Sequence, residues 1–172
     1  MPPFRWIACV AMLAAATVAR ADYQVTLSNV HLCCKGCIRD AKEAGGTVAD
    51  TVVTPDKDTR TIKISASSQA AAQKAVNALV DGGFYGESSD PAIKVPSITG
   101  ADKTVNGLKV SGVHLCCNHC VSDLNKTVGK VKGVTGTTAE KDADSFEIQG
   151  NFNAKDVVAA LHTAGFAAQV LQ

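Results

Sequence analysis

Aromatic residues are scarce in this 172-residue chain, at 5% of the total, and neither sign of charge is in excess. With so few aromatic side chains, any core must be small and mainly aliphatic. The formal net charge of +1 gives no electrostatic drive toward nucleic acid or an anionic membrane surface. The longest apolar run, residues 6–18, is shorter than the roughly 20 residues that a membrane-spanning helix needs.

The first 21 residues have the pattern of a secretory signal peptide. Arg5 supplies a basic start, residues 6–18 form the apolar segment, and residues 19–21 (Ala-Arg-Ala) are a small-x-small cleavage site. The alternative, an uncleaved membrane anchor, is disfavoured because no stop-transfer flank follows. We expect an exported protein, periplasmic or extracellular, whose mature chain starts at Asp22 and has no stable membrane insertion.

The mature chain that this cleavage predicts has the size of two small modules. Of the 17 basic residues, Arg5 and Arg20 leave with the leader, so 15 basic side chains stand against 16 acidic ones. The remaining length suits two modules of about 65 to 75 residues, for which a single core is only marginally sufficient. Cys9 also leaves with the leader, so six cysteines remain.

Those six cysteines lie in two copies of one motif. Residues 31–37 read HLCCKGC, and residues 114–120 read HLCCNHC, 83 positions later. Packing alone does not require this order of sulfurs, whereas soft-metal chemistry does. The motif supplies eight candidate metal ligands: Cys33, Cys34, Cys37, His31, Cys116, Cys117, Cys120 and His114.

The spacing of the sulfurs favours copper(I). A Cys-x-x-Cys whose second cysteine opens a helix places thiols where free backbone N–H groups and the helix dipole favour thiolate. Copper(I) accepts two or three sulfur ligands, whereas zinc generally takes four and magnesium or calcium avoid thiolate. The added Cys33 or Cys116 permits trigonal coordination. His31 or His114 could complete a four-ligand set, which opens the alternative of zinc or cadmium.

The repeat also divides the chain. We expect a first module over residues 22–89, a linker over residues 90–104 that is rich in proline and small polar residues, and a second module over residues 105–172. The linker contains three apolar residues that could instead dock as an extra edge strand: Ile93, Val95 and Ile98.

Periodicity predicts the order strand, helix, strand, strand, helix, strand in each module. This order indicates an α+β fold of two tandem ferredoxin-like sandwiches, each with two helices on one face of a four-stranded antiparallel sheet. In the first module the elements are expected at residues 23–30, from 37 to 44, 48–54, 59–65 and 68–81, and from Phe84 onward. In the second, strands are expected at residues 107–113, 134–141, 145–149 and 166–171. The helices are expected from the cysteine loop to about residue 128 and at residues 154–163.

Each module resembles a heavy-metal-associated domain, the family of copper chaperones, the amino-terminal modules of copper-transporting ATPases and the periplasmic mercury-binding protein. That family carries Gly-Met-x-Cys-x-x-Cys after its first strand, where this chain has residues 34–37 and 117–120. Its glycine-aromatic step before the last strand is matched at residues 83–84 and 165–166. The resemblance implies that the two cysteines of each loop bind metal and that an aromatic packs beneath them. Here no methionine precedes the cysteines, and an extra cysteine comes directly before the first ligand.

The remaining histidines and aromatics have subordinate expected roles. His31 and His114 recur in both copies as ligands or as hydrogen-bond partners of ligands, the alternative being a hydrogen-bonded residue at a strand end. His119 occurs in one copy only and is expected to face solvent, and His162 is expected at the surface. Phe84 and Phe166 are expected in the core, with a supporting role at the metal loops.

We therefore predict an exported soft-metal-binding protein, and not an enzyme, that carries or scavenges copper(I) by thiolate exchange. Mercury(II) or zinc(II) bound by the same Cys-Cys-x-x-Cys loops is an alternative. The expected partners are the ion and a metal transporter or acceptor protein, without nucleic acid. Whether each module binds its own ion or the two share one stays open.

Two other classes of protein use cysteines in this way. A thiol-disulfide redox protein also has Cys-x-x-Cys at a helix start, but it needs a proline opposite the loop. The mature prolines, Pro55, Pro91 and Pro96, fall in a hairpin and in the linker. A disulfide-stapled structural or interaction protein is the second class, since disulfides are the default in exported proteins and six cysteines allow 15 pairings.

Overall fold

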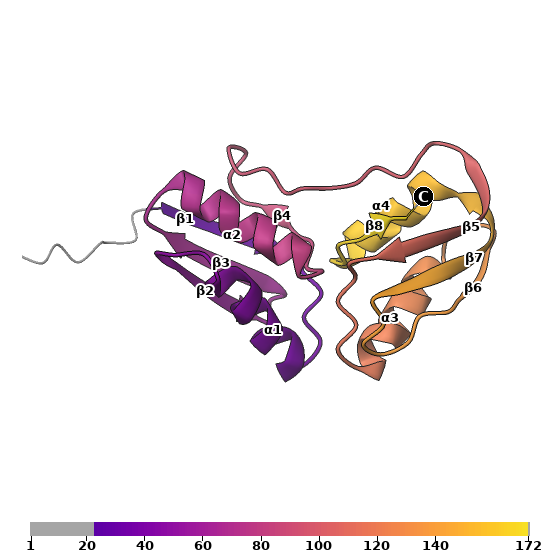
Figure 1. Cartoon of the computed structure of the whole chain (residues 1–172), viewed down its shortest axis with the longest axis horizontal. Helices are drawn as coiled ribbons and strands as arrows, with labels where there is room; N and C mark the ends of the chain where they lie inside the picture. Colours follow the sequence, from indigo (N-terminus) through magenta and orange to yellow (C-terminus); the bar gives the residue numbers. More distant parts are fainter. Residues whose placement is uncertain (1–22, 172) are drawn as a thin grey trace, which may run out of the picture.

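The computed structural model describes residues 23–171 (Figure 1). The predicted signal peptide, its cleavage site and Cys9 lie outside these residues. No helix in the described part is both long and apolar enough to cross a membrane.

The first module is a four-stranded antiparallel sheet in the order β2-β3-β1-β4, covered by two helices (Figure 1). This is the ferredoxin-like arrangement that the sequence predicts. Its elements are β1 (Tyr23–Ser28), α1 (Lys35–Gly46), β2 (Thr51–Asp56), β3 (Thr61–Ala66), α2 (Gln69–Asp81) and β4 (Glu87–Ser88).

The second module repeats the arrangement, with a sheet in the order β6-β7-β5-β8 and two helices. The predicted fold class is therefore confirmed for both halves of the described chain. The elements here are β5 (Thr104–Ser111), α3 (Asn118–Val128), β6 (Val134–Thr137), β7 (Ser145–Asn153), α4 (Ala154–Ala164) and β8 (Gln169–Val170).

Local sequence explains most element boundaries. Along β1 the side chains of Val25 and Leu27 alternate inward and are buried. α2 starts at the Ser68 cap, whose hydroxyl oxygen accepts the N–H of Ala71. The predicted inward positions Ile62 and Ile64 of β3 are fully buried. α1 differs from its prediction, because it continues through both glycines that were expected to end it and stops at Gly46.

The segment between the modules docks without forming a strand. No strand is assigned over residues 89–103, so the edge-strand alternative is wrong. Ile93 is nonetheless buried, and the Gln73 side chain on α2 bonds both backbone groups of Lys94, at 2.8 Å to its N–H and 2.6 Å to its carbonyl. The linker is therefore held along α2 rather than hanging free.

The aromatic steps after α2 and α4 join the two modules. Phe84 and Phe166 were expected to begin the last strands, but β4 and β8 start only at Glu87 and Gln169. The two phenylalanines instead form an antiparallel bridge with each other across the module boundary. Both are almost fully buried, and the core residues of the two modules belong to one continuous apolar cluster.

Two glycines make this docking sterically allowed. The Gly165 carbonyl accepts the N–H groups of His31 and Tyr85 at 3.2 and 3.1 Å, and the Gly83 carbonyl accepts the N–H of Ala167 at 3.1 Å. Both glycines have φ of 89°, in the region that L side chains disfavour. A Cβ at Gly83 would lie 2.4 Å from the backbone nitrogen of His114, so the opposite backbone occupies the space of a side chain.

Replacing Gly165 by alanine should lower the free energy of unfolding by at least about 1–2 kcal/mol, because of the positive φ. The added Cβ would also meet the Asn29 carbonyl oxygen at 2.2 Å. The matched control is Gly46→Ala in α1, where nothing lies within 4 Å and a gain of about 0.5–1 kcal/mol is expected. Urea denaturation followed by circular dichroism measures both, and a Gly165→Ala chain as stable as the parent would contradict the docked arrangement.

Candidate metal centre

The two cysteine loops have the same backbone course. Cys34 caps the N-terminus of α1 with φ −150° and ψ 174°, and Cys117 caps α3 with φ −156° and ψ 165°. Neither side chain bonds the helix N–H groups as a cap, so both sulfurs are free to face other partners. Cys37 and Cys120 lie one turn further, in the first turn of each helix, and are fully buried.

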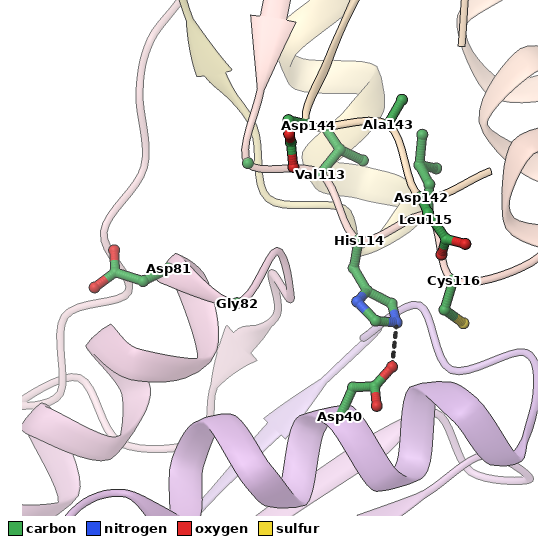
Figure 2. Close-up of a pocket in the computed structure, with 11 residues that line it drawn as sticks. Asp40, Asp81, Gly82, Val113, His114, Leu115, Cys116, Asp142, Ala143 and Asp144 are labelled. Atoms are coloured by element: carbon green, nitrogen blue, oxygen red, sulfur yellow. Dashed lines mark ion pairs between the residues drawn. The ribbon is translucent and has the colours of Figure 1, made fainter. Parts of the chain in front are cut away.

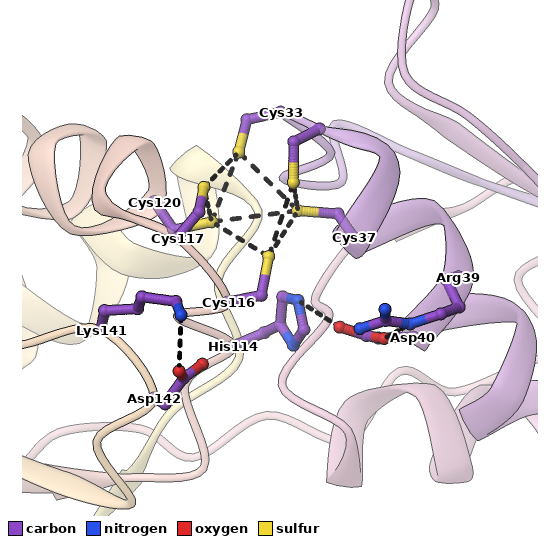
Figure 3. A network of polar contacts seen from close by, with 11 residues as sticks. Cys33, Cys37, Arg39, Asp40, His114, Cys116, Cys117, Cys120, Lys141 and Asp142 are labelled. Carbon is purple, nitrogen blue, oxygen red and sulfur yellow. Dashed lines mark hydrogen bonds and ion pairs between the residues drawn. The ribbon is translucent and has the colours of Figure 1, made fainter.

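All six cysteine sulfurs of the described chain come together between the modules (Figure 3). Nine contacts with Sγ–Sγ distances of 3.3 to 3.9 Å connect them, and five of the nine cross from one module to the other. A disulfide bond is about 2.05 Å long, so these cysteines are free thiols. Two thiolates on one soft ion, each about 2.3 Å from it, are separated by about 3.8 to 4.0 Å. The cluster is thus close to the spacing that metal ligands require.

Cys37 and Cys120 form a buried pair at the centre of the cluster, and their pKa values are shifted in opposite directions. The sulfurs of Cys37 and Cys120 are 3.9 Å apart. Contact with the Cys120 thiol lowers the pKa of Cys37, against the effect of burial, and the His114 imidazole lowers it further. The same contact, together with burial, raises the pKa of Cys120. Cys37 is therefore the more acidic thiol of the two.

The outer thiols differ from one another. Burial is the main reason why the pKa values of Cys33 and Cys116 are raised well above the ordinary value of 9.0. For Cys117 burial also acts upward, but the backbone N–H groups of Cys120 and His119 and the Cys120 thiol outweigh it and lower the pKa to about 7. Cys117 is thus ionised at lower pH than Cys33 and Cys116.

His31 and His114 are held by the opposite module. The His31 ring stacks on Phe166 at a centroid distance of 4.1 Å, and the His114 ring lies 4.5 Å from Phe84. The Nε2 atoms of both are buried and have no hydrogen-bond partner. Burial lowers the pKa of His31, so its imidazole is neutral at neutral pH and can act as a donor of a lone pair. A ring nitrogen of His31 lies within 4.8 Å of the Cys33 and Cys120 sulfurs.

The sequence reasoning missed Asp40 and Asp123. Asp40 on α1 has a carboxylate oxygen 3.5 Å from Nε2 of His114 (Figure 3). Asp123 on α3 lies near His31 and favours its positive form. The two aspartates are separated by the same 83 positions as the cysteines. That offset was the signal that could have found them.

Of the two remaining histidines, His119 lies where it was expected and His162 does not. His119 is 65% exposed and faces Asp123, as expected of a solvent-facing residue. His162 was expected at the surface, but it is only partly exposed and stacks on Tyr85 of the other module at a centroid distance of 4.0 Å. Burial accordingly lowers the pKa of His162.

Two hollows of opposite charge lead to the cluster, and each is lined by residues of both modules. The first, shown in Figure 2, leads to His114 and Cys116 and is lined by four aspartates: Asp40, Asp81, Asp142 and Asp144. The second leads to His31 and Cys33 and is lined by four basic residues together with Asp123: Lys57, Arg60, Lys126 and Lys130. The sulfur cluster is nearly symmetric, whereas its two approaches are not.

In the reduced, metal-free chain, Cys117 should be alkylated by iodoacetamide with a pH midpoint near 7, because the thiolate is the reacting form. Cys33 and Cys116, whose pKa values burial raises, should stay unreacted at that pH. Quenched reactions and peptide mass mapping measure each site, with the urea-unfolded chain as control. Equal labelling of the three cysteines in the folded chain at every pH would contradict these thiol environments.

Comparison with known proteins finds similar solved structures, among them the two that follow. No family model and no curated protein sequence matches the chain. The N-terminal soluble domains of Bacillus subtilis CopA align over 87% of this chain and 93% of their own, with 12% identity and a TM-score of 0.30. The first two RRM domains of the yeast poly(U)-binding protein Pub1 align over 87% of this chain and 98% of their own, with 11% identity and a TM-score of 0.26.

Proposed function

We propose that this chain is an exported copper(I)-binding protein, a carrier or scavenger and not an enzyme, which holds the ion with thiolates of its six-cysteine cluster. The observation that carries the proposal is the convergence of six free sulfurs, at Sγ–Sγ distances of 3.3 to 3.9 Å, from two loops 83 residues apart. Three thiolates around one ion are a donor set that copper(I) accepts without a further ligand.

The buried position of the cluster agrees with a soft monovalent ion. The cluster itself offers sulfur, and at its edge the Asp40 carboxylate pairs with the His114 imidazole at 3.5 Å and lies within 4.8 Å of the Cys116 sulfur. Oxygen-preferring ions such as magnesium and calcium therefore have no suitable ligands there. Mercury(II) shares the preference for thiolate and is the alternative cargo within the same class.

Zinc(II) is a second candidate because of the histidines. The Nε2 atom of His31 is buried without a hydrogen-bond partner, which is a costly arrangement for a polar group, whereas Nε2 of His114 faces the Asp40 carboxylate at 3.5 Å. A Cys₃His set would use such a nitrogen as the fourth ligand of a tetrahedral zinc site. The choice between the two ions depends on whether an imidazole joins the three sulfurs.

Transfer would proceed by exchange of thiolates. Cys33, Cys34, Cys116 and Cys117 are partly exposed, whereas Cys37 and Cys120 are buried, so an incoming ion meets an outer sulfur first. Each step forms one copper–sulfur bond to this chain and breaks one to the donor, while the proton of the entering thiol passes to the released donor thiolate. Delivery to a transporter or acceptor protein would reverse these steps.

The reduced chain, residues 22–172, should compete with a chromophoric chelator for two copper(I) ions under anaerobic conditions and should bind zinc(II) weakly in a parallel titration. Two ions are expected because six thiolates make two complete sets of three. Strong zinc binding without competition for copper would overturn the copper assignment in favour of the Cys₃His site. Uptake of neither ion would move the case to a redox or disulfide-stapled protein.

A further inference from the structure

We propose that the cluster consists of two three-sulfur sites, each of which takes its third thiolate from the other module. The proposal deepens the copper-binding function proposed above and rests on it. The first site, called the α1 site, consists of Cys34, Cys37 and Cys116; the second, the α3 site, consists of Cys117, Cys120 and Cys33.

In these two sets every sulfur touches both of its partners. In the α1 site the Sγ–Sγ distances are 3.7 Å for Cys34–Cys37, 3.6 Å for Cys34–Cys116 and 3.6 Å for Cys37–Cys116. In the α3 site they are 3.6 Å for Cys117–Cys120, 3.8 Å for Cys33–Cys117 and 3.3 Å for Cys33–Cys120. Each of the six cysteines is used once, so two ions fit without sharing a ligand.

A site built within one module has a poorer geometry. Cys33 contacts Cys37 at 3.7 Å, but with the adjacent Cys34 it shares only a looser proximity within 4.8 Å. The reason is the extended backbone at Cys34, which turns successive side chains to opposite sides. Cys33 therefore turns away from Cys34, and its shortest sulfur contact, 3.3 Å, is with Cys120 of the other module. The extended backbone at Cys117 does the same for Cys116.

Gly36, between Cys34 and Cys37 of the first loop, supports the assignment of Cys116 to the α1 site. A Cβ at Gly36 would lie 3.2 Å from the Cys116 sulfur and 3.3 Å from the Cys34 sulfur. Cys116 thus lies directly over the loop of the opposite module, in the space that the missing side chain leaves free. The corresponding residue of the second loop, His119, turns outward and is exposed.

The histidines follow the exchanged cysteines. His31 precedes Cys33 and has a ring nitrogen within 4.8 Å of Cys33 and Cys120, so it stands at the α3 site. His114 precedes Cys116 and has a ring nitrogen within 4.8 Å of its sulfur, so it stands at the α1 site. Each module therefore lends the other a cysteine and an imidazole together.

The crossed arrangement is tested by leaving one Cys-x-x-Cys pair in place and removing each candidate third ligand in turn. In the Cys34→Ser/Cys37→Ser chain, the remaining ion should depend on Cys33 from the first module and not on Cys116 from the second. Adding Cys33→Ser should weaken copper(I) binding at least about tenfold, since even indirect partners of a metal contribute that much. Adding Cys116→Ser, the matched control, should leave the affinity unchanged.

The reciprocal background exchanges the two roles. In the Cys117→Ser/Cys120→Ser chain, Cys116→Ser should weaken binding and Cys33→Ser should not. Chelator competition gives the affinities, and X-ray absorption gives the number of sulfur ligands, which should fall from three to two only in the weakened chains.

The other possible results separate a failure of the crossed assignment from a failure of copper binding. Dependence on the cysteine of the same module, on both or on neither would overturn the crossed assignment while copper binding stands. A parent chain that takes up no copper would overturn the proposed function and this inference together.

Discussion

The docking of the two modules through Gly83 and Gly165 is the constraint on which the site depends. Each glycine places a backbone carbonyl against the other module, in a conformation and a space that a side chain would not allow. The aromatic residue that follows each glycine packs against the histidine ring of the opposite loop. The position of each cysteine loop is thus set by the far module as much as by its own, and the six sulfurs meet because both contacts form at once.

The docking brings six ionisable thiols into a small, partly buried volume. Burial raises the pKa values of Cys33 and Cys116, and contact with Cys37 together with burial raises that of Cys120. Six thiolates side by side would repel one another strongly, so the metal-free cluster keeps most of its protons and gives them up as the ion binds. The two approaches then differ in sign, since four aspartates line the hollow at Cys116 and basic residues dominate the one at Cys33. A cation is drawn toward the first hollow.

Sequence patterns predicted the fold of each module far better than they predicted how the two modules pack against each other. Alternation and helix caps were local signals, and they identified β1, α2 and the buried face of β3 correctly. The repeat of the cysteine motif singled out the residues that cluster. Nothing in either loop alone, however, indicated that the sulfurs would meet, because that depends on contacts such as the one between His31 and Gly165, which are 134 residues apart. The misplacement of His162, expected at the surface but stacked on Tyr85, has the same origin.

Placing both loops on one chain changes what the cysteines can do. A lone module of this size has a marginal core and presents its thiols on an open loop. Here the second module is held close by a linker that itself packs along α2, so its effective concentration at the first loop is high without any metal. The free energy of docking is then already present when the ion arrives, and the ion finds ligands that need little rearrangement. Four of the six sulfurs stay partly exposed, so under the proposed function the site would remain open to exchange with a second thiolate protein. The same geometry thus suits both firm binding and release by ligand substitution, provided that the partner reaches the outer sulfurs before the buried ones.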